Sequence, residues 1–238
     1  MSRIVDPILE GLRHKVIHMG SAAEAILEKS VRALVETDTL LAMEVQEDDL
    51  EIDRLDVEID DAVLRALALQ APVADDLRQV VAVKMVATDL ERVGDLARNI
   101  AKSAVRLSSR TSTELPPRLS ELAREARALL RSALDAYASL DVVKAQAVLD
   151  SDDQVDEDEE LVVREAIADM GREPERNAVL VEFILVAKNL ERVADHATNI
   201  AEDVVLAARG QNLKHADKLG TDPSTGEPAA GLQKSGMS

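Results

Sequence analysis

Pairs of carboxylates spaced four residues apart are the side chains of this sequence best suited to chemistry. Glu91 and Asp95 form one pair, and Glu191 and Asp195 form another one hundred residues later. Residues four apart on a helix are surface neighbours, where like charges destabilise by about 0.2–0.5 kcal/mol. Stacked carboxylate oxygens suit a hard cation, which would offset that repulsion. The same oxygen-bearing rows continue at Asn99, Asn199 and Asp203.

A second pair of acids precedes each of these. The pairs are Asp49 and Asp53 in the first half, and Asp152 and Asp156 in the second. Residues 44–61 contain ten acidic residues and one basic residue, and residues 150–160 contain eight acidic residues and no basic one. If the two helices of each half pack side by side, four carboxylates converge, and a multivalent cation relieves their repulsion. The pattern predicts one cation site per half, with a merely solvated acidic surface as the alternative.

Basic and imidazole groups adjacent to these acids have a different predicted role. Arg92 and Arg192 each follow a glutamate, but a residue one position along points about 100° away around the helix. We expect ion pairs within each bundle, such as Asp89 with Arg92, while a contact with phosphate or a partner stays open. His196 follows Asp195 and is expected to face away from the acidic row for the same reason, with a role as a metal ligand as the alternative.

Several classes of active site are excluded by spacing. The chain has no cysteine, and none of its four histidines follows a glutamate at the spacing of a di-iron bundle. It also lacks the His-Glu-x-x-His, Gly-x-x-x-x-Gly-Lys and Gly-x-Ser-x-Gly motifs. We therefore expect no enzymatic activity. A metal-dependent phosphohydrolase and a purely structural acidic oligomer remain as alternatives.

Glycine placement predicts an all-α fold for the elements that position these acids. Four of the nine glycines lie before residue 210, and the other five fall in the last 29 residues. A β-rich or α/β domain requires more glycine in its turns. Alanine, leucine, glutamate and arginine, which are strong helix formers, dominate instead.

Helix punctuation divides the chain into six helices in two groups of three. Breaks are predicted at 37–39, 72–75, 108–117, 139–141 and 171–174. The predicted organisation is a three-helix bundle over 1–108, a linker over 109–117, a second bundle over 118–209, and a disordered polar tail over 210–238.

The two groups also match in sequence. Residues 87–101 and 187–201 share ten identities in fifteen positions, including Leu-Glu-Arg-Val and Asn-Ile-Ala. Each of these stretches carries apolar residues at spacings of three and four, the pattern of a bundle seam. An internal duplication explains both observations and predicts two sequence-related three-helix bundles in tandem.

The charge balance excludes further function classes. Of 238 residues, 28 are Lys or Arg and 46 are Asp or Glu, a net charge of −18. That balance argues against binding to nucleic acid or to anionic membrane surfaces. No stretch of eighteen apolar residues is present, so we expect no membrane insertion and a cytoplasmic location.

Two motifs resemble the phosphate transport system accessory protein family, PhoU. They are Asp89-Leu-Glu-Arg-Val-Gly-Asp95, preceded by Asp76-Leu77-Arg78, and Asn189-Leu-Glu-Arg-Val-Ala-Asp-His-Ala-Thr-Asn-Ile-Ala-Glu202. The resemblance spans roughly residues 5–210. It implies two three-helix bundles that carry multinuclear clusters of iron, zinc or nickel on their surfaces, and no enzymatic activity.

The resemblance also implies ligands and partners. Glu91, Asp95, Glu191 and Asp195 match the ligand motif, and Asp49, Asp53, Asp152 and Asp156 match its counterpart on the preceding helix. The implied role is negative regulation of phosphate uptake and of the phosphate-starvation response, through contacts with the ATPase of a phosphate ABC transporter and with a sensor histidine kinase. A homodimer is expected. The sequence departs from the family pattern at Ala194, where a glycine is usual, and in its C-terminal tail.

Overall fold

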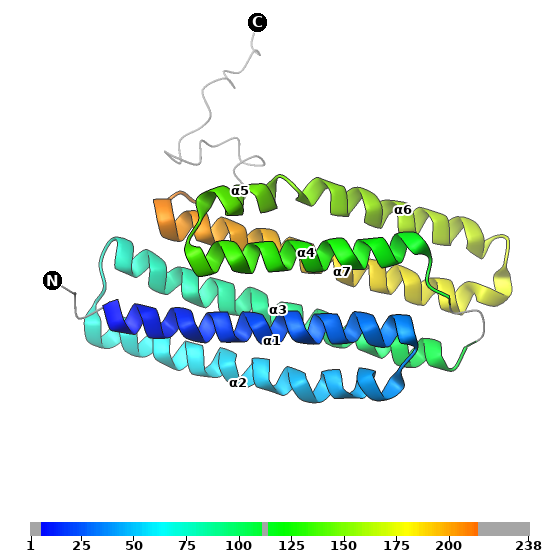
Figure 1. Ribbon diagram of the computed structural model, residues 1–238, viewed down its shortest axis with the longest axis horizontal. Coiled ribbons are helices and arrows are strands. Elements are labelled where there is room, and N and C mark those ends of the chain that lie inside the picture. The colour runs from blue at the N-terminus through cyan, green and yellow to red at the C-terminus, as the bar shows by residue number, and fades with distance from the viewer. Residues whose placement is uncertain (1–5, 111–113, 214–238) are drawn as a thin grey trace, which may run out of the picture.

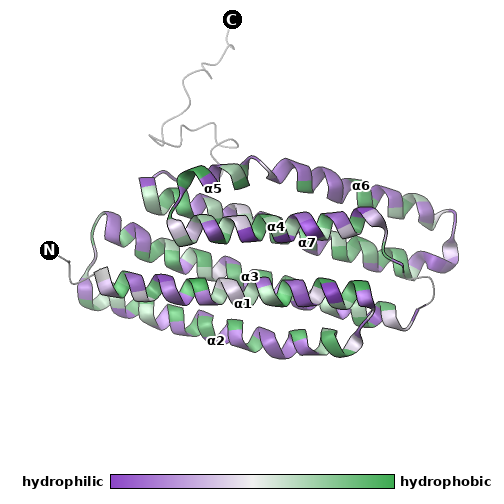
Figure 2. Cartoon of the chain, in the orientation of Figure 1, coloured by the Kyte–Doolittle hydropathy of each residue, from purple (hydrophilic) through white to green (hydrophobic). Residues whose placement is uncertain are grey.

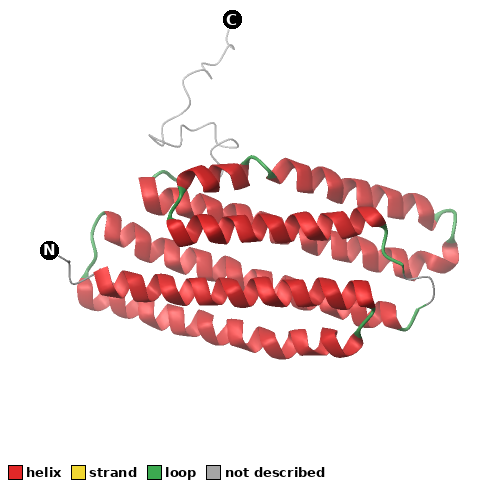
Figure 3. Ribbon diagram, viewed as in Figure 1, coloured by secondary structure: helices red, strands yellow, loops and turns green. Residues whose placement is uncertain are grey.

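The protein is described here by a computed structural model, in which residues 6–110 and 114–213 are placed. Helices and short loops make up this described part, and it contains no strand (Figure 3). The helices are α1 (Asp6–Glu36), α2 (Thr39–Gln70), α3 (Asp75–Ser108), α4 (Pro117–Ser139), α5 (Val142–Leu149), α6 (Asp152–Met170) and α7 (Asn177–Arg209), with a 3-10 turn at Pro174–Arg176.

Two layers of antiparallel helices form the molecule (Figure 1). Helices α1, α2 and α3 pack on one another, α4 to α7 form the second layer, and α3 packs along α7 to join the layers. The predicted seams lie in this core. Their buried members include Val83, Leu90 and Ala97 on α3 and Phe183, Leu190 and Ala197 on α7. The predicted all-α fold with two related bundles is confirmed.

Equivalent aspartates begin the second helix of each bundle. Thr37 and Leu140 have positive φ values of 55° and 48° and end the first helix of their bundles. The carboxylate of Asp38 accepts hydrogen bonds from two backbone N–H groups in the first turn of α2, at 2.9 and 3.0 Å. Asp141 does the same for α5, at 2.9 and 3.2 Å. These caps fix a common register, in which residue n of α2 corresponds to residue n + 103.

The fifth predicted helix is interrupted, so that α5 and α6 occur where the pattern indicates one element. The hydroxyl of Ser151 donates to the carbonyl oxygen of Ala147 at 2.8 Å, and Gln146 Nε2 donates to the Asp150 carboxylate at 2.9 Å. Short polar side chains that bond to the local backbone compete with helix continuation. The break places Asp152 in the first turn of a new helix, where a carboxylate is favoured by the helix dipole.

Two further predictions concern the ends of the bundles and the membrane. The predicted linker lies between α3 and α4, and its residues 111–113 lie outside the described residues. Residues 214–238 of the predicted tail also lie outside them. Among the described helices, none has a stretch apolar enough and long enough to cross a bilayer.

Candidate metal centre

In the first bundle, the acids meet a cation supplied by the protein itself. Asp49 on α2 is buried against α3, with 2% of its surface exposed. Arg98 on α3 donates from Nη1 to Asp49 Oδ2 at 2.6 Å and from Nη2 to Asp95 Oδ1 at 2.5 Å. Its guanidinium therefore lies between two of the carboxylates that the sequence predicts to be metal ligands.

Close helix packing brings Asp49 to this position. A Cβ atom built on Gly94 would lie 2.6 Å from Asp49 Oδ1 and 3.2 Å from Ile52 Cδ1, so only glycine leaves room there. Burial is the main cause that raises the pKa of Asp49, and the positive charge of Arg98 opposes it. The ion pair with Arg98 therefore offsets part of the cost of burying the Asp49 carboxylate.

The other two predicted ligands of the first bundle lie beside this ion pair. Glu91 is half-buried, and burial raises its pKa, while Arg92 lowers it. Asp53 is exposed on α2, and its negative charge adds to the rise in the pKa of both Glu91 and Asp49. Arg92 lies 3.4 Å from Glu91 and 3.6 Å from Asp95, so its expected pairing with Asp89 is wrong.

In the second bundle, three carboxylates converge with no such cation. One oxygen each of Asp152 and Asp156 on α6 and of Asp195 on α7 lies within 4.8 Å of the others. None of these three acids forms an ion pair with a described residue. Asp152 Oδ1 is buried and has no hydrogen-bond partner among the described residues. Burial, followed by the charges of Asp156 and Asp195, raises the pKa of Asp152 to about 6. We call these three residues the α6–α7 triad.

A single difference between the repeats explains the contrast. Thr198 occupies the position of Arg98, one hundred residues later, and its hydroxyl donates to the backbone carbonyl of Asp195 at 2.8 Å. A threonine cannot reach across to α6 or supply positive charge. The α6–α7 triad therefore retains its negative charge, whereas the matching acids of the first bundle are neutralised.

The fourth predicted ligand of the second bundle lies at the edge of the triad. Burial and the charge of Asp195 raise the pKa of Glu191, and Lys188 lowers it. Lys188 itself pairs with the buried Glu159, with 2.9 Å between Nζ and Oε2. Burial likewise is the first cause that raises the pKa of Asp156, ahead of the charge of Asp195. Glu191 is thus close to the triad without belonging to its tightest contact.

His196, beside the acidic row of α7, and Asn199, a member of the predicted oxygen row, serve the contact between the bundles. His196 Nδ1 lies 2.7 Å from Asp89 Oδ1, and Asn199 Nδ2 donates to the same oxygen at 3.2 Å. His196 therefore faces α3 and not the triad, in agreement with the prediction that it points away from the acidic row. Asp203 is fully buried.

The residues that sequence reasoning missed left a signal in the repeat. Positions 98 and 198, 96 and 196, and 89 and 189 are among the five mismatches in the fifteen aligned positions. Arg98, His196 and Asp89 are the members of these mismatched pairs that form the contacts described above. Differences between duplicated segments thus indicate where the two sites diverge.

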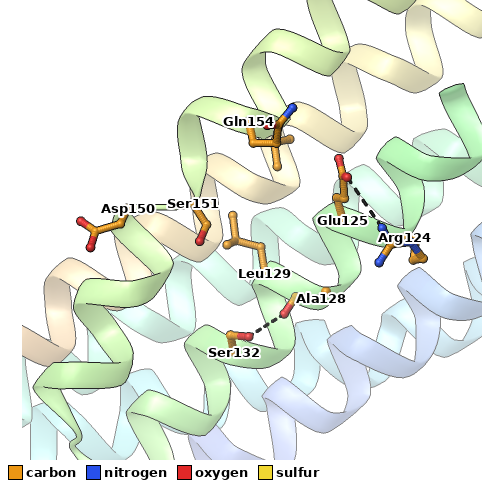
Figure 4. A pocket seen from close by; sticks show the side chains of 9 residues that line it. Arg124, Glu125, Ala128, Leu129, Ser132, Asp150, Ser151 and Gln154 are labelled. Carbon is orange, nitrogen blue, oxygen red and sulfur yellow. Dashed lines mark hydrogen bonds and ion pairs between the residues drawn. The ribbon is translucent and has the colours of Figure 1, made fainter.

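A separate surface groove lies between α4 and the α5–α6 break (Figure 4). Leu129 and Val155 form its apolar wall, Ser132 and Gln154 line it, and Asp150 points away from the other lining side chains. Gln154 is two positions from both Asp152 and Asp156, which is about 200° around the helix. The groove and the triad therefore lie on different faces of α6.

Comparisons with known proteins place both halves in one family. The model of the PhoU domain matches residues 16–104 and 119–204. The phosphate-specific transport system accessory protein PhoU homolog of Zymomonas mobilis is 38% identical over 208 residues, covering 87% of this chain and 88% of the relative. The PhoU accessory protein of Escherichia coli K12 is 31% identical over 207 residues, covering 87% and 86%.

Solved structures agree with these matches. The crystal structure of PhoU from Pseudomonas aeruginosa superposes with a TM-score of 0.82 at 32% identity, covering 86% of this chain and 99% of that one. The phosphate transport system regulatory protein PhoU from Streptococcus pneumoniae gives 0.81 at 25% identity, covering 88% and 99%. The relatives are named as accessory and regulatory proteins rather than as enzymes, in line with the expectation from sequence. On the strength of both domain matches and of these relatives, the chain belongs to the PhoU family.

Proposed function

We propose that this chain is a regulatory accessory protein of a phosphate transport system, and that it acts by docking and not by turnover. The observation that carries the proposal is the family match over both bundles, at residues 16–104 and 119–204. Its partners are the ATPase of a phosphate ABC transporter and a sensor histidine kinase, and it works as a cytoplasmic negative regulator of phosphate uptake. The family motifs in both repeats support this assignment.

The same proposal includes a cation site at the α6–α7 triad. Three carboxylate oxygens within 4.8 Å, one of them buried and without a hydrogen-bond partner, are an oxygen donor set that fits a metal ion. Among the expected ions, iron suits such a set better than thiolate-seeking metals do. When bound, the ion supplies positive charge that offsets the mutual repulsion of the triad.

In the first bundle, Arg98 replaces the ion. Its guanidinium already contacts Asp49 and Asp95, so a metal ion there would have to displace a paired cation from a largely buried site. We therefore assign the cation site to the second bundle alone. Glu91 and Asp53 remain as acidic neighbours of the ion pair.

Docking that depends on charge follows from this arrangement. The segment 150–160, which includes the start of α6, contains eight acidic residues, and cation loading of the triad lowers their negative potential locally. A partner that binds this face would distinguish the metal-loaded protein from the metal-free one. The side chains of Asp152, Asp156 and Asp195 hold the ion, and the exposed acids around them form the contact.

Elemental analysis with matched variants tests the cation site. The protein is chelated, reloaded with ferrous iron or zinc, and desalted before measurement. We expect retained metal in the wild type, its loss in Asp156→Asn/Asp195→Asn, and retention in the matched control Asp53→Asn/Asp95→Asn. Equal retention in wild type and both variants would place the ion elsewhere.

Pull-downs test the regulatory role separately. The purified chain, loaded or chelated, is presented to the transporter ATPase and to the sensor kinase at low and high phosphate. We expect retention of at least one partner, with more retained by the loaded protein. An absence of binding to either partner under all four conditions contradicts the docking role, whatever the metal content.

A further inference from the structure

Helix α2 carries a second apolar stripe that none of the other described helices covers. Met43, Leu50, Val57 and Leu64 are exposed to 59, 53, 63 and 64%, and each follows the previous one by seven residues. Hydrophobic and hydrophilic turns alternate along this helix in Figure 2. We call these four residues the α2 stripe.

The stripe lies opposite the face by which α2 packs into its bundle. Each member stands two positions before a buried residue, and two positions correspond to about 200° around a helix. The buried residues are Val45, Ile52, Ile59 and Ala66. Since α2 packs on α1 and α3 through that buried face, the stripe points away from both.

The fold does not require the stripe, because the repeat lacks it. In the common register fixed by Asp38 and Asp141, the matching positions of α5 and α6 are polar at three of four places. They are Gln146, Asp153, Glu160 and Ile167. The second bundle thus forms the same packing with a polar outer face, so the apolar residues on α2 need another explanation.

The seven-residue spacing of the α2 stripe indicates the shape of the partner segment that covers the stripe. Apolar residues repeated every seven positions form a line that runs nearly parallel to the helix axis, about 30 Å long over the 21 residues from Met43 to Leu64, and a second helix laid along α2 can contact all four of them. The spacing therefore favours a helical segment of about three heptads, the length from Met43 to Leu64.

Charge identifies the chemistry of that segment. Helix α2 carries ten acidic and two basic residues, a net charge of −8. Glu47 and Asp61 lie on one side of the stripe and Asp53 lies on the other, and none of the three forms an ion pair with any described residue. A second copy of α2, or an anionic lipid surface, would meet this charge with charge of the same sign.

We propose that the α2 stripe docks an amphipathic helix of another protein, one with apolar residues at heptad spacing and Lys or Arg on both flanks. The apolar stripe supplies the binding area, and the basic flanks pair with Glu47 and Asp61 on one side and with Asp53 on the other. The surface lies on the first bundle and is independent of the α6–α7 triad. Loss of the cation site therefore leaves this docking unchanged.

Synthetic peptides test the proposal on the full chain. The probe is a three-heptad helix with Leu at the seam, Lys and Arg on the flanks, and one Trp. Because the chain contains no Trp, the peptide fluorescence reports binding directly. The matched peptide carries Glu on its flanks. We expect the basic peptide to bind, with an affinity that falls as salt rises, and the acidic peptide to fail.

Variants locate the site. Leu50→Asp/Val57→Glu installs the residue types of the second bundle and should weaken the basic peptide about tenfold or more, with an unchanged melting temperature. Ile167→Asp, on the second bundle, should leave binding unchanged. The proposal is overturned if the basic peptide fails to bind, or if it binds wild type and Leu50→Asp/Val57→Glu equally. It is also overturned if the double variant abolishes a wild-type dimer or vesicle binding instead.

Discussion

The two bundles arrange the same acids around different cations. In the first, Asp49 and Asp95 share the guanidinium of Arg98, whereas in the second Thr198 occupies the position of Arg98 and its hydroxyl donates to the backbone carbonyl of Asp195. The change of one residue type turns a self-neutralised site into one that needs a counter-ion. Duplication preserved the helices and their register, while the charge balance of each site diverged.

Replacing Arg98 should give the largest effect on stability. In Arg98→Thr the buried Asp49 carboxylate loses its partner, and we expect unfolding free energy to fall by about 2–3 kcal/mol, reduced from the fully buried case because Arg98 is 34% exposed. Urea unfolding in chelator measures this loss. Added zinc or iron should restore part of it, and no recovery would mean that the vacated site cannot bind an ion.

The reciprocal variant should change metal affinity. Thr198→Arg places a guanidinium beside the α6–α7 triad and should weaken metal binding at least about tenfold, equivalent to about 1.4 kcal/mol. Isothermal titration of the chelated protein provides the measurement. Thr198→Val, which has no charge, is the matched control and should bind as wild type does. Unaltered affinity in Thr198→Arg would contradict the equivalence of the two positions.

The effect of changing the small residue at position 94 or 194, where helices pack closely, should also differ between the bundles. Gly94→Ala directs a methyl group at the buried Asp49 and should destabilise by about 1–2 kcal/mol despite the higher helix propensity of alanine. At the related position, Ala194→Gly should lose about 1 kcal/mol or less, mainly through helix propensity. Thermal unfolding of the two variants compares them. A stabilised Gly94→Ala protein would show that α2 and α3 are less tightly packed than the structure indicates.

The smallest expected effect is the dependence of the metal-free protein's stability on pH. The pKa of Asp152 is about 6 in the folded protein, above about 3.9 in an unfolded chain, so the folded state binds more protons between these values. Metal-free stability should therefore fall as pH rises from about 4 to above 6. Because the site is partly solvated, we expect about 1 kcal/mol at most. Urea unfolding in chelator should show this slope in wild type, flattened in Asp152→Asn.

Much of the fold follows from local sequence signals. The caps at Asp38 and Asp141, the apolar seams and the ten identities between repeats predict the helices and their duplication. Such features act within a few residues or recur at a fixed offset, so one sequence is enough to detect them. The break at residues 150–151 is less visible, because Asp and Ser also occur in continuous helices.

The candidate site was predictable in membership but not in charge balance. Four-residue spacing identifies the pair Asp152 and Asp156 on α6 and the pair Glu191 and Asp195 on α7, since neighbouring turns of one helix are a local property, but it does not show that Glu191 lies at the edge of the triad. The placement of Arg98 between α2 and α3 depends on how the two helices pack. The same limit applies to the Asp89–His196 contact, which joins residues 107 positions apart in different bundles.

Anomalous X-ray diffraction from iron- or zinc-loaded crystals tests the central claim most directly. We expect a strong peak among the carboxylates of Asp152, Asp156 and Asp195, with Arg98 still between Asp49 and Asp95 and no peak there. Peaks of equal height in both bundles, or a peak only in the first, would contradict it.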